Sequence, residues 1–214
     1  MKKILVFDMD GTLLDTMGMW KKLSDDLGDK LHLLESVDPL PAEEGSMVEY
    51  CYRLVKNNFP HANQESMHRI IHDHLLDFYS RNDLCKPNVY EQLEEFYKNG
   101  YEMYVATATD YFFAETGIRS NGLNKFIKKI YTPDTVNYSK GNEEYFKYFI
   151  NEIGVSPDNI IFFDDALYAN QLANKLGLVS VGVFDEYSYN NEEVKEEADF
   201  FIKDFNEINS LMLI

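Results

Sequence analysis

The stretch that decides the fold is Ile4-Leu5-Val6-Phe7-Asp8-Met9-Asp10-Gly11-Thr12. Its four apolar residues, bounded by charge and a glycine, predict a strand buried on both faces, as in a parallel sheet. Asp8 and Asp10 then lie at the carboxyl end of this strand, where open α/β sheets bind their ligands. Two carboxylates this close repel each other unless a cation or a shared proton relieves the repulsion. The pair is therefore a candidate metal or catalytic site.

Composition limits the possible partners. The 214 residues are 45% hydrophobic and carry a formal net charge of −17, which argues against binding nucleic acid or an anionic membrane surface. The apolar runs are too short to span a bilayer, and Asp8 interrupts the only run that resembles a signal peptide. Cys51 and Cys85 lack metal-ligand spacing and are expected to be reduced thiols. We therefore expect a cytoplasmic protein with no membrane or nucleic-acid partner, and nothing in the sequence indicates an oligomeric state.

Strands and helices alternate from Lys86-Pro87 onward, which predicts an α/β fold with a parallel sheet between two helical layers. The acidic stretch from Asp185 to Asp199 is interpreted as a solvated surface. The predicted strands cover 101–107, 126–131, 160–163, 179–183 and 200–202, and the predicted helices cover 89–97, 111–120, 145–153 and 166–176.

The segment from residue 16 to residue 86 shows helical periodicity and no convincing strand, so it reads as an inserted all-helical domain. One helix of the segment is expected to end at Gly28, and 29–46 is expected to be a connection. The expected apolar stripes are Met19, Trp20, Leu23 and Leu27 in a first helix, a second helix over 47–55, and Met67, Ile70, Ile71, His74, Leu75 and Phe78 in a third.

The stretch from Phe7 to Thr16 resembles the opening motif of the haloacid dehalogenase-like (HAD) phosphohydrolases almost letter for letter. The resemblance implies that Asp8 is the nucleophile that accepts the phosphoryl group. It implies that Asp10 protonates the leaving alcohol and later deprotonates the attacking water. The family's Rossmann-like catalytic core would span 1–15 and 87–214, and its helical cap would span 16–86. Within the family, the phosphoglycolate phosphatase and β-phosphoglucomutase branch has such a cap.

Two further motifs of the family have counterparts here. Thr107, at the end of a predicted strand, matches the residue whose hydroxyl binds the phosphoryl oxygens together with the next backbone N–H, that of Ala108. Lys140 matches the lysine that balances the nucleophile and the phosphate, although Gly141 stands where relatives usually have proline. From its position before a helix, Thr109 is expected to be a helix cap.

The last motif of the family resembles the pair Asp164-Asp165, which follows the apolar run 160–163. The resemblance makes Asp165 a direct ligand of Mg²⁺ and Asp164 a ligand directly or through water. With Asp8 and Asp10, four carboxylates would come from two adjacent strand ends. Oxygen ligands of this kind suit Mg²⁺ rather than zinc.

The expected activity is Mg²⁺-dependent hydrolysis of a small phosphorylated metabolite through an aspartyl-phosphate. The alternatives are a phosphosugar mutase resembling β-phosphoglucomutase and a non-catalytic protein on a HAD scaffold. Sugar-phosphate mutases of this branch have a histidine about where Trp20 stands, which argues against the mutase. All site acids and Lys140 are present, which argues against a non-catalytic scaffold. Hydrolysis is therefore favoured. Glu43 and Glu44 in the expected specificity loop favour a polyol, sugar or amine over a carboxylate-bearing substrate.

His68 and His72 are spaced i, i+4, which is a spacing that can bind zinc. The glutamate that metalloproteases place after the first histidine is absent, and no third ligand is evident. We therefore interpret both histidines as part of an exposed polar helix face.

Overall fold

The computed structural model describes residues 4–20, 22, 45–58, 61, 63–188 and 190–211. Its core is a six-stranded sheet in the order β3-β2-β1-β4-β5-β6, and all five neighbouring pairs are parallel. This confirms the predicted α/β fold, with the last strand at the edge. The strands are β1 (Ile4–Phe7), β2 (Glu102–Ala106), β3 (Ile127–Tyr131), β4 (Ile160–Asp164), β5 (Val179–Val183) and β6 (Phe200–Ile202).

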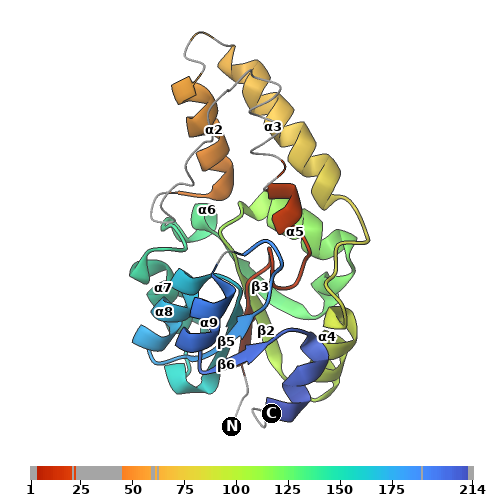
Figure 1. Cartoon of the computed structure of the whole chain (residues 1–214), viewed down its shortest axis with the longest axis vertical. Helices are drawn as coiled ribbons and strands as arrows, with labels where there is room; N and C mark the ends of the chain where they lie inside the picture. The colour runs from red at the N-terminus through yellow and green to blue at the C-terminus, as the bar shows by residue number, and fades with distance from the viewer. Residues whose placement is uncertain are drawn as a thin grey trace.

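Helices cover both faces of the sheet (Figure 1). Because side chains alternate along a strand, Leu5 and Phe7 enter one hydrophobic cluster and Ile4 and Val6 enter the other. The first cluster includes residues of α4 (Val89–Lys98) and α5 (Tyr111–Ser120), and the second includes residues of α7 (Glu143–Ile153) and α8 (Leu167–Lys175). Each large apolar side chain buried in this way contributes about 1.5–3 kcal/mol to folding.

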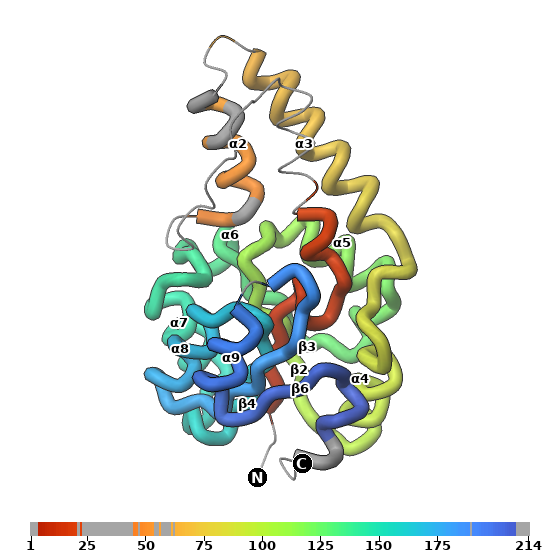
Figure 2. The backbone as a smooth tube through the Cα atoms, in the orientation of Figure 1, coloured from red at the N-terminus to blue at the C-terminus, as the bar shows by residue number. Residues whose placement is uncertain are grey.

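A helical segment is inserted between β1 and β2, beyond the carboxyl ends of the strands (Figures 1 and 2). Residues 17–20 are helical, and α2 (Met47–Asn58) and α3 (Gln64–Tyr79) follow. The linker that enters the segment and the linker that leaves it are joined by a hydrogen bond, which Asp15 N donates to Leu84 O at 2.7 Å. The arrangement is consistent with a cap over the sheet, and we call the inserted segment the cap segment.

The α3 stripe differs from the predicted one. Its buried residues are Ile71, Leu75 and Tyr79, whereas Ile70 is 48% exposed. His68 and His72 do not form an exposed polar face, since both are half-buried and pack against aromatic rings; the His68 ring lies 3.9 Å from that of Tyr52. The flat imidazole faces act here as apolar surface. In the first helix, Leu23, Leu27 and Gly28 lie outside the described residues.

The acidic stretch after β5 is more ordered than predicted. It contains α9 (Asn191–Glu197), and both Asp185 and Val194 are buried. Val194 packs against Gly182 of β5, where an added Cβ would come within 2.6 Å of it. Four other short elements were not predicted: α6 (Pro133–Val136) and the 3₁₀ helices η1 (Leu123–Lys125), η2 (Pro157–Asn159) and η3 (Phe205–Leu211).

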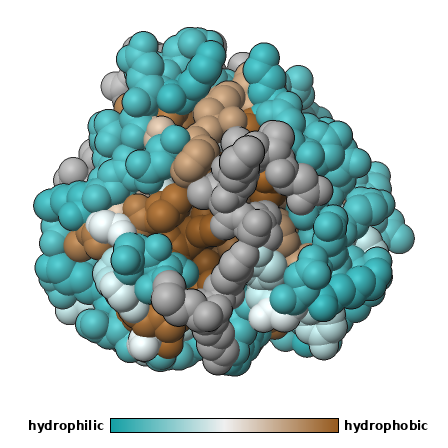
Figure 3. Space-filling view, turned by 90° about the horizontal axis from the view of Figure 1, so that it is seen from below, coloured by the Kyte–Doolittle hydropathy of each residue, from teal (hydrophilic) through white to brown (hydrophobic). Residues whose placement is uncertain are grey.

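The surface fits the composition. Seen from the end opposite α2 and α3, hydrophilic residues make up most of the outline, and hydrophobic residues gather in the middle of the view (Figure 3). Among the described residues, no helix combines the length and apolar character needed to cross a membrane. Cys51 and Cys85 are both free thiols, as expected.

Candidate active site

The strand order reverses beside β1, which lies between β2 and β4. Ligands of open α/β sheets bind at such a switch point, outside the carboxyl ends of the strands. Asp8 follows β1 directly, and its backbone N–H donates to Phe163 O at 2.8 Å. Asp164 ends β4 and Asp165 comes next. The pairing of two strands therefore brings together acids that are more than 150 residues apart in the sequence.

Three buried carboxylates meet at this point. Asp8, Asp164 and Asp165 each offer one ligand oxygen within 4.8 Å of the others, and no other such group of acids, histidines or cysteines occurs in the described part of the chain. The Lys140 ammonium group lies between two of them, with Nζ 2.5 Å from Asp8 Oδ1 and 2.6 Å from Asp164 Oδ2. Lys140 is only 2% exposed, so it is not an ordinary surface lysine.

Burial and mutual repulsion perturb these groups strongly. Burial raises the pKa of Asp8 well above its usual range, against the opposing effect of Lys140. Burial, followed by the charge of Asp164, raises the pKa of Asp165 to about 8. Burial alone would lower the pKa of Lys140, but Asp164 and Asp8 outweigh it and hold that pKa well above the usual value. Three acids with one ammonium group are therefore short of positive charge.

Asp165 is the least satisfied of the three acids. Its one hydrogen bond within the described residues comes from Thr12 Oγ1, at 3.4 Å to Oδ1, although the residue is only 5% exposed. Its carboxylate lies against Gly11, where an added Cβ would be 2.6 Å from Oδ2. Gly11 also has φ +81°, so glycine is required there for two reasons. A buried carboxylate with free lone pairs beside two other acids suits a hard divalent cation such as Mg²⁺.

Asp10 points away from this cluster. Its Oδ1 accepts hydrogen bonds from Thr16 Oγ1 at 2.6 Å and Tyr79 OH at 2.7 Å, and its Oδ2 accepts one from Thr109 Oγ1 at 2.7 Å. Trp20 Nε1 in turn donates to the Tyr79 hydroxyl at 3.1 Å. Instead of four converging carboxylates, the structure brings together three, and the Asp10 carboxylate is held by hydroxyl groups of both core and cap segment.

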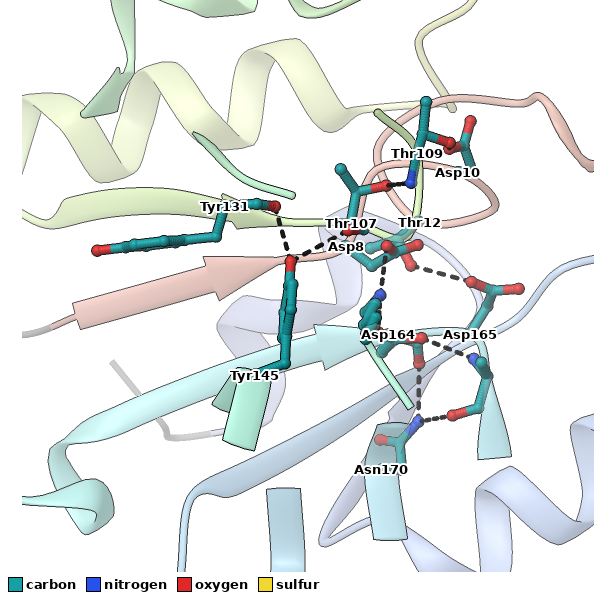
Figure 4. A network of polar contacts seen from close by, with 12 residues as sticks. Asp8, Asp10, Thr12, Thr107, Thr109, Tyr131, Tyr145, Asp164, Asp165 and Asn170 are labelled. Carbon is teal, nitrogen blue, oxygen red and sulfur yellow. Dashed lines mark hydrogen bonds and ion pairs between the residues drawn. The ribbon is translucent and has the colours of Figure 1, made fainter. Parts of the chain in front are cut away.

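The expected phosphoryl-binding groups lie at the end of β2, next to β1 (Figure 4). Thr107 is fully buried, and its Oγ1 accepts a hydrogen bond from Thr109 N at 3.2 Å. The backbone N–H of Ala108 donates no hydrogen bond to any described residue. The expectation that Thr109 caps α5 is wrong, because Asp110 occupies the N-cap position and the Thr109 hydroxyl is bound to Asp10.

The sequence reasoning missed the role of Tyr79. Tyr79 lies 69 residues from Asp10, and the only local signal was an aromatic residue at the end of an amphipathic helix. The hydrogen bond from Trp20 to Tyr79 likewise joins two residues that no local pattern connects. Thr16 lies in the opening motif of the family, but the motif does not predict its hydrogen bond to Asp10.

We expect the substitution Tyr79→Phe to reduce kcat on the order of tenfold, because Asp10 would lose one of its three donors. It would also leave the Trp20 N–H without its acceptor, so the fluorescence of Trp20, the single tryptophan, should change. Steady-state kinetics and emission spectra measure both effects. Tyr97→Phe, at a position 57% exposed, is the control. Wild-type kcat and emission in Tyr79→Phe would contradict a role for this hydroxyl.

Asp110 joins α2 to the core. Its Oδ2 accepts a hydrogen bond from Ser46 Oγ at 2.8 Å, and Ser46 also forms a capping box with Glu49 at the start of α2. Burial, with smaller contributions from the facing acids Asp134 and Glu49, raises the pKa of Asp110 to about 6. The Ser46 hydroxyl opposes these effects. This junction therefore holds a carboxylate that is unfavourable when ionised.

Because the folded-state pKa of Asp110 exceeds the unfolded value of 3.8, the folded protein retains a proton that the unfolded chain has released. The contribution of this group to stability therefore falls as the pH rises from about 4 to about 6. We expect Asp110→Asn to raise the free energy of unfolding at pH 7.5 by about 1 kcal/mol, after allowing for solvent screening of a half-buried group. Urea unfolding at pH 5 and pH 7.5 measures this. A gain that does not shrink at pH 5 would contradict it.

Comparison with known proteins agrees with this geometry. A family model described as haloacid dehalogenase-like hydrolase matches residues 5–183. Pyrophosphatase PpaX of Bacillus velezensis is 24% identical over 189 residues, covering 84% of this chain and 82% of the relative. Fructose-1-phosphate phosphatase YqaB of Escherichia coli is 24% identical over 184 residues, covering 84% and 95%.

Among solved structures, a predicted phosphoglycolate phosphatase from Haemophilus somnus 129PT has the same fold. It superposes with a TM-score of 0.79 at 20% identity and covers 98% of this chain and 97% of its own. Because the family model matches most of the sequence, the protein belongs to the haloacid dehalogenase-like hydrolase family.

Proposed function

We propose that the protein is a Mg²⁺-dependent phosphatase that hydrolyses a small phosphomonoester through an aspartyl-phosphate on Asp8. The observation that carries this proposal is the buried cluster of Asp8, Asp164 and Asp165 around the Lys140 ammonium group. So many buried acids with so few cations are unfavourable for folding alone and are typical of a site built for a charged ligand.

In the first half of the proposed reaction, an Asp8 carboxylate oxygen attacks the phosphorus atom in line with the leaving oxygen. The ester P–O bond breaks, and the leaving alkoxide takes a proton from Asp10. Thr107 and the free N–H of Ala108 bind the phosphoryl oxygens, and Lys140 balances the negative charge on the phosphoryl group. Positioning and electrostatics supply most of the catalysis.

In the second half, Asp10 accepts a proton from a water molecule as its oxygen attacks the phosphorus atom. The bond between phosphorus and the Asp8 oxygen breaks, which releases phosphate and restores the carboxylate. Asp10 must therefore reach the reacting atoms. The hydroxyl groups of Thr16, Tyr79 and Thr109 define where this carboxylate rests between such steps.

Asp8 and Asp165 would hold the metal, with Asp164 as a ligand directly or through water. Asp10 is also predicted as a ligand from the sequence, but its carboxylate lies outside the cluster, so its proposed part is the proton transfer. Bound Mg²⁺ supplies positive charge that neutralises the acids and the phosphoryl group. The domain boundaries are proposed as a core of 1–15 and 87–214 and a cap of 16–86.

We expect the substrate to be the phosphate ester of a neutral or positively charged compound, such as a sugar, a polyol or an amine. Glu49 and Asp110, the two acids at the junction between α2 and α5, would repel a substrate carboxylate that came near them. Glu43 and Glu44, which favour the same substrate class, lie outside the described residues. The named activities of the relatives add pyrophosphate and fructose 1-phosphate as compounds to test.

Turnover of p-nitrophenyl phosphate with Mg²⁺ and with EDTA tests the proposal, and a panel of sugar, polyol, amino-alcohol and carboxylate phosphates then ranks substrates. We expect hydrolysis that requires Mg²⁺. No turnover with metal would favour a non-catalytic scaffold. Conversion of β-glucose 1-phosphate to glucose 6-phosphate with a bisphosphate primer would identify a mutase instead. Trp20 argues against that outcome, since an indole N–H cannot accept a proton.

We expect Asp165→Ala to raise the Mg²⁺ concentration needed for half-maximal turnover by roughly 10-fold or more, because a direct oxygen ligand is lost. A Mg²⁺ titration of turnover measures this. Asp158→Ala, at an exposed position away from the site, is the control. An unchanged titration in Asp165→Ala would exclude Asp165 as a ligand.

A further inference from the structure

The Lys86 ammonium group is buried where three loops meet. Its Nζ donates to Gly11 O and to Phe184 O, each at 2.6 Å, and to Asp185 Oδ2 at 3.1 Å. The side chains of Lys86 and Asp185 are 13% and 2% exposed. An ammonium group has three donors, and all three find acceptors here. This is an organised contact and not an incidental surface ion pair.

One of the three loops carries the proposed catalytic acids. Gly11 follows Asp10, and its carbonyl is held by Lys86. The Asp165 carboxylate lies against the other side of the same residue, close enough that an added Cβ at Gly11 would be 2.6 Å from Oδ2. A shift of the Gly11 peptide would therefore move the surface on which Asp165 rests.

The second loop follows β5 and is built around Asp185. Asp185 Oδ1 accepts from Tyr187 N at 2.9 Å, and its carbonyl accepts from Asn191 Nδ2 at 2.7 Å. The Tyr187 ring lies against Gly18, at the entry to the cap segment. Asp185 is therefore fixed by its own loop. The Gly11 loop is held by its own hydrogen bonds, such as Gly11 N to Leu14 O at 2.9 Å, and by the Lys86 ammonium group on its carbonyl.

The third contribution is the linker that returns from the cap segment, on which Lys86 itself stands. Its backbone N–H donates to Leu13 O at 3.0 Å, so the linker pairs with the chain just after the catalytic loop. The ammonium group thus connects the returning linker to the Gly11 loop and to the loop after β5, beside the acidic cluster.

We propose that Lys86 is a positioning residue for this cluster: by holding the Gly11 carbonyl, it fixes the surface against which Asp165 lies and thereby sets the affinity for Mg²⁺. The inference rests on the proposed function, since it assigns Asp165 to the metal. Lys86 forms no hydrogen bond or ion pair with the three acids. Its charge lowers the pKa of Asp165 and the charge of Asp185 raises it, and beside these direct effects the proposed positioning is transmitted through the Gly11 peptide.

The competing explanation is that Lys86 only neutralises Asp185. Lys86→Met alone cannot separate the two, because it leaves Asp185 buried without a cation and can unfold the protein. We therefore compare Asp185→Asn with the double variant Lys86→Met/Asp185→Asn. Both lack the Asp185 charge, so they differ only in Lys86. Lys129→Met, which removes an exposed ion pair with Glu152, is the surface control.

Mg²⁺ alone is the probe, and its dissociation constant is measured by isothermal titration calorimetry, with urea unfolding in EDTA as the stability control. We expect Lys129→Met to bind Mg²⁺ like the wild type. Asp185→Asn should differ from the wild type far less than the double variant does, because Asp185 acts on Asp165 only through its charge. The double variant should retain the unfolding midpoint of Asp185→Asn but bind Mg²⁺ roughly 10- to 100-fold more weakly. Equal affinity in the double variant and in Asp185→Asn would overturn the inference, as would a loss of affinity already complete in Asp185→Asn.

The outcomes also separate this inference from the proposed function. Wild-type protein that binds Mg²⁺ without hydrolysing any phosphomonoester would contradict the function but leave the comparison of variants valid. Hydrolysis with equal Mg²⁺ affinity in both variants would contradict only the role of Lys86. Wild-type protein that does not bind Mg²⁺ would overturn both.

Discussion

The substitution Asp8→Asn is expected to reduce kcat by on the order of 10⁴-fold or more, because an amide cannot form the aspartyl-phosphate. The fold should persist. Asparagine has the same shape, and burial already favours the neutral form of Asp8 by raising its pKa. Lys140 keeps Asp164 as a partner at 2.6 Å. We therefore expect the free energy of unfolding in EDTA to stay within about 1 kcal/mol of the wild type.

Steady-state turnover of p-nitrophenyl phosphate, circular dichroism and urea unfolding measure these effects. Asp158→Asn, an exposed site far from the cluster, controls for the general loss of one acid. Turnover near the wild-type rate in Asp8→Asn would rule out Asp8 as the nucleophile. An unfolded variant would show that Asp8 matters to the fold rather than to the chemistry.

Lys140→Met should have the second largest effect, and it should lower both the turnover rate and the free energy of unfolding. It removes the ammonium group that lies between Asp8 and Asp164. We expect turnover to fall by roughly a hundredfold to a thousandfold, because the charge of the transferring phosphoryl group is no longer balanced. In EDTA the free energy of unfolding should fall by about 3–5 kcal/mol, since buried carboxylates lose their counter-charge.

Added Mg²⁺ should restore part of the stability of Lys140→Met, because the metal replaces the missing positive charge. Urea unfolding with EDTA and with Mg²⁺ measures the difference. Lys129→Met, which breaks an exposed pair with Glu152, should change little under either condition. Unchanged stability in EDTA would show that Lys140 does not hold the acids together.

The strands and the acids at their ends could be predicted because their signals are local. A run such as 160–163 is apolar at every position, so it must be buried on both faces, and Asp164 and Asp165 follow at once. Because β1 and β4 pair in parallel, these acids then lie beside Asp8. Lys140 was located only through its resemblance to a family motif, since one lysine before a helix carries no local signal of burial.

The face of α3 could not be fixed from the sequence. Ile70 and Ile71 are both apolar and adjacent, so periodicity alone cannot decide which one is buried. The protein buries Ile71 and packs His68 and His72 against aromatic rings, a use of histidine that a hydrophobic pattern does not register.

Contacts between distant segments account for the remaining differences. The hydrogen bond from Tyr79 to Asp10 and the contacts of Lys86 depend on where the cap linkers meet the core. The burial of Asp185 likewise depends on Lys86, which lies 99 residues away. An acidic segment is normally solvated, and here one of its acids is buried because a cation from another loop neutralises it.

A crystal structure with Mg²⁺ and beryllium trifluoride tests most directly whether the buried acids around Lys140 form a metal and phosphoryl site. We expect Mg²⁺ at about 2.1 Å from oxygens of Asp8 and Asp165, and beryllium trifluoride bonded to the Asp8 carboxylate in contact with Lys140. A cluster without either ion at saturating concentrations, or with the Asp8 and Asp165 side chains turned apart, would contradict this assignment.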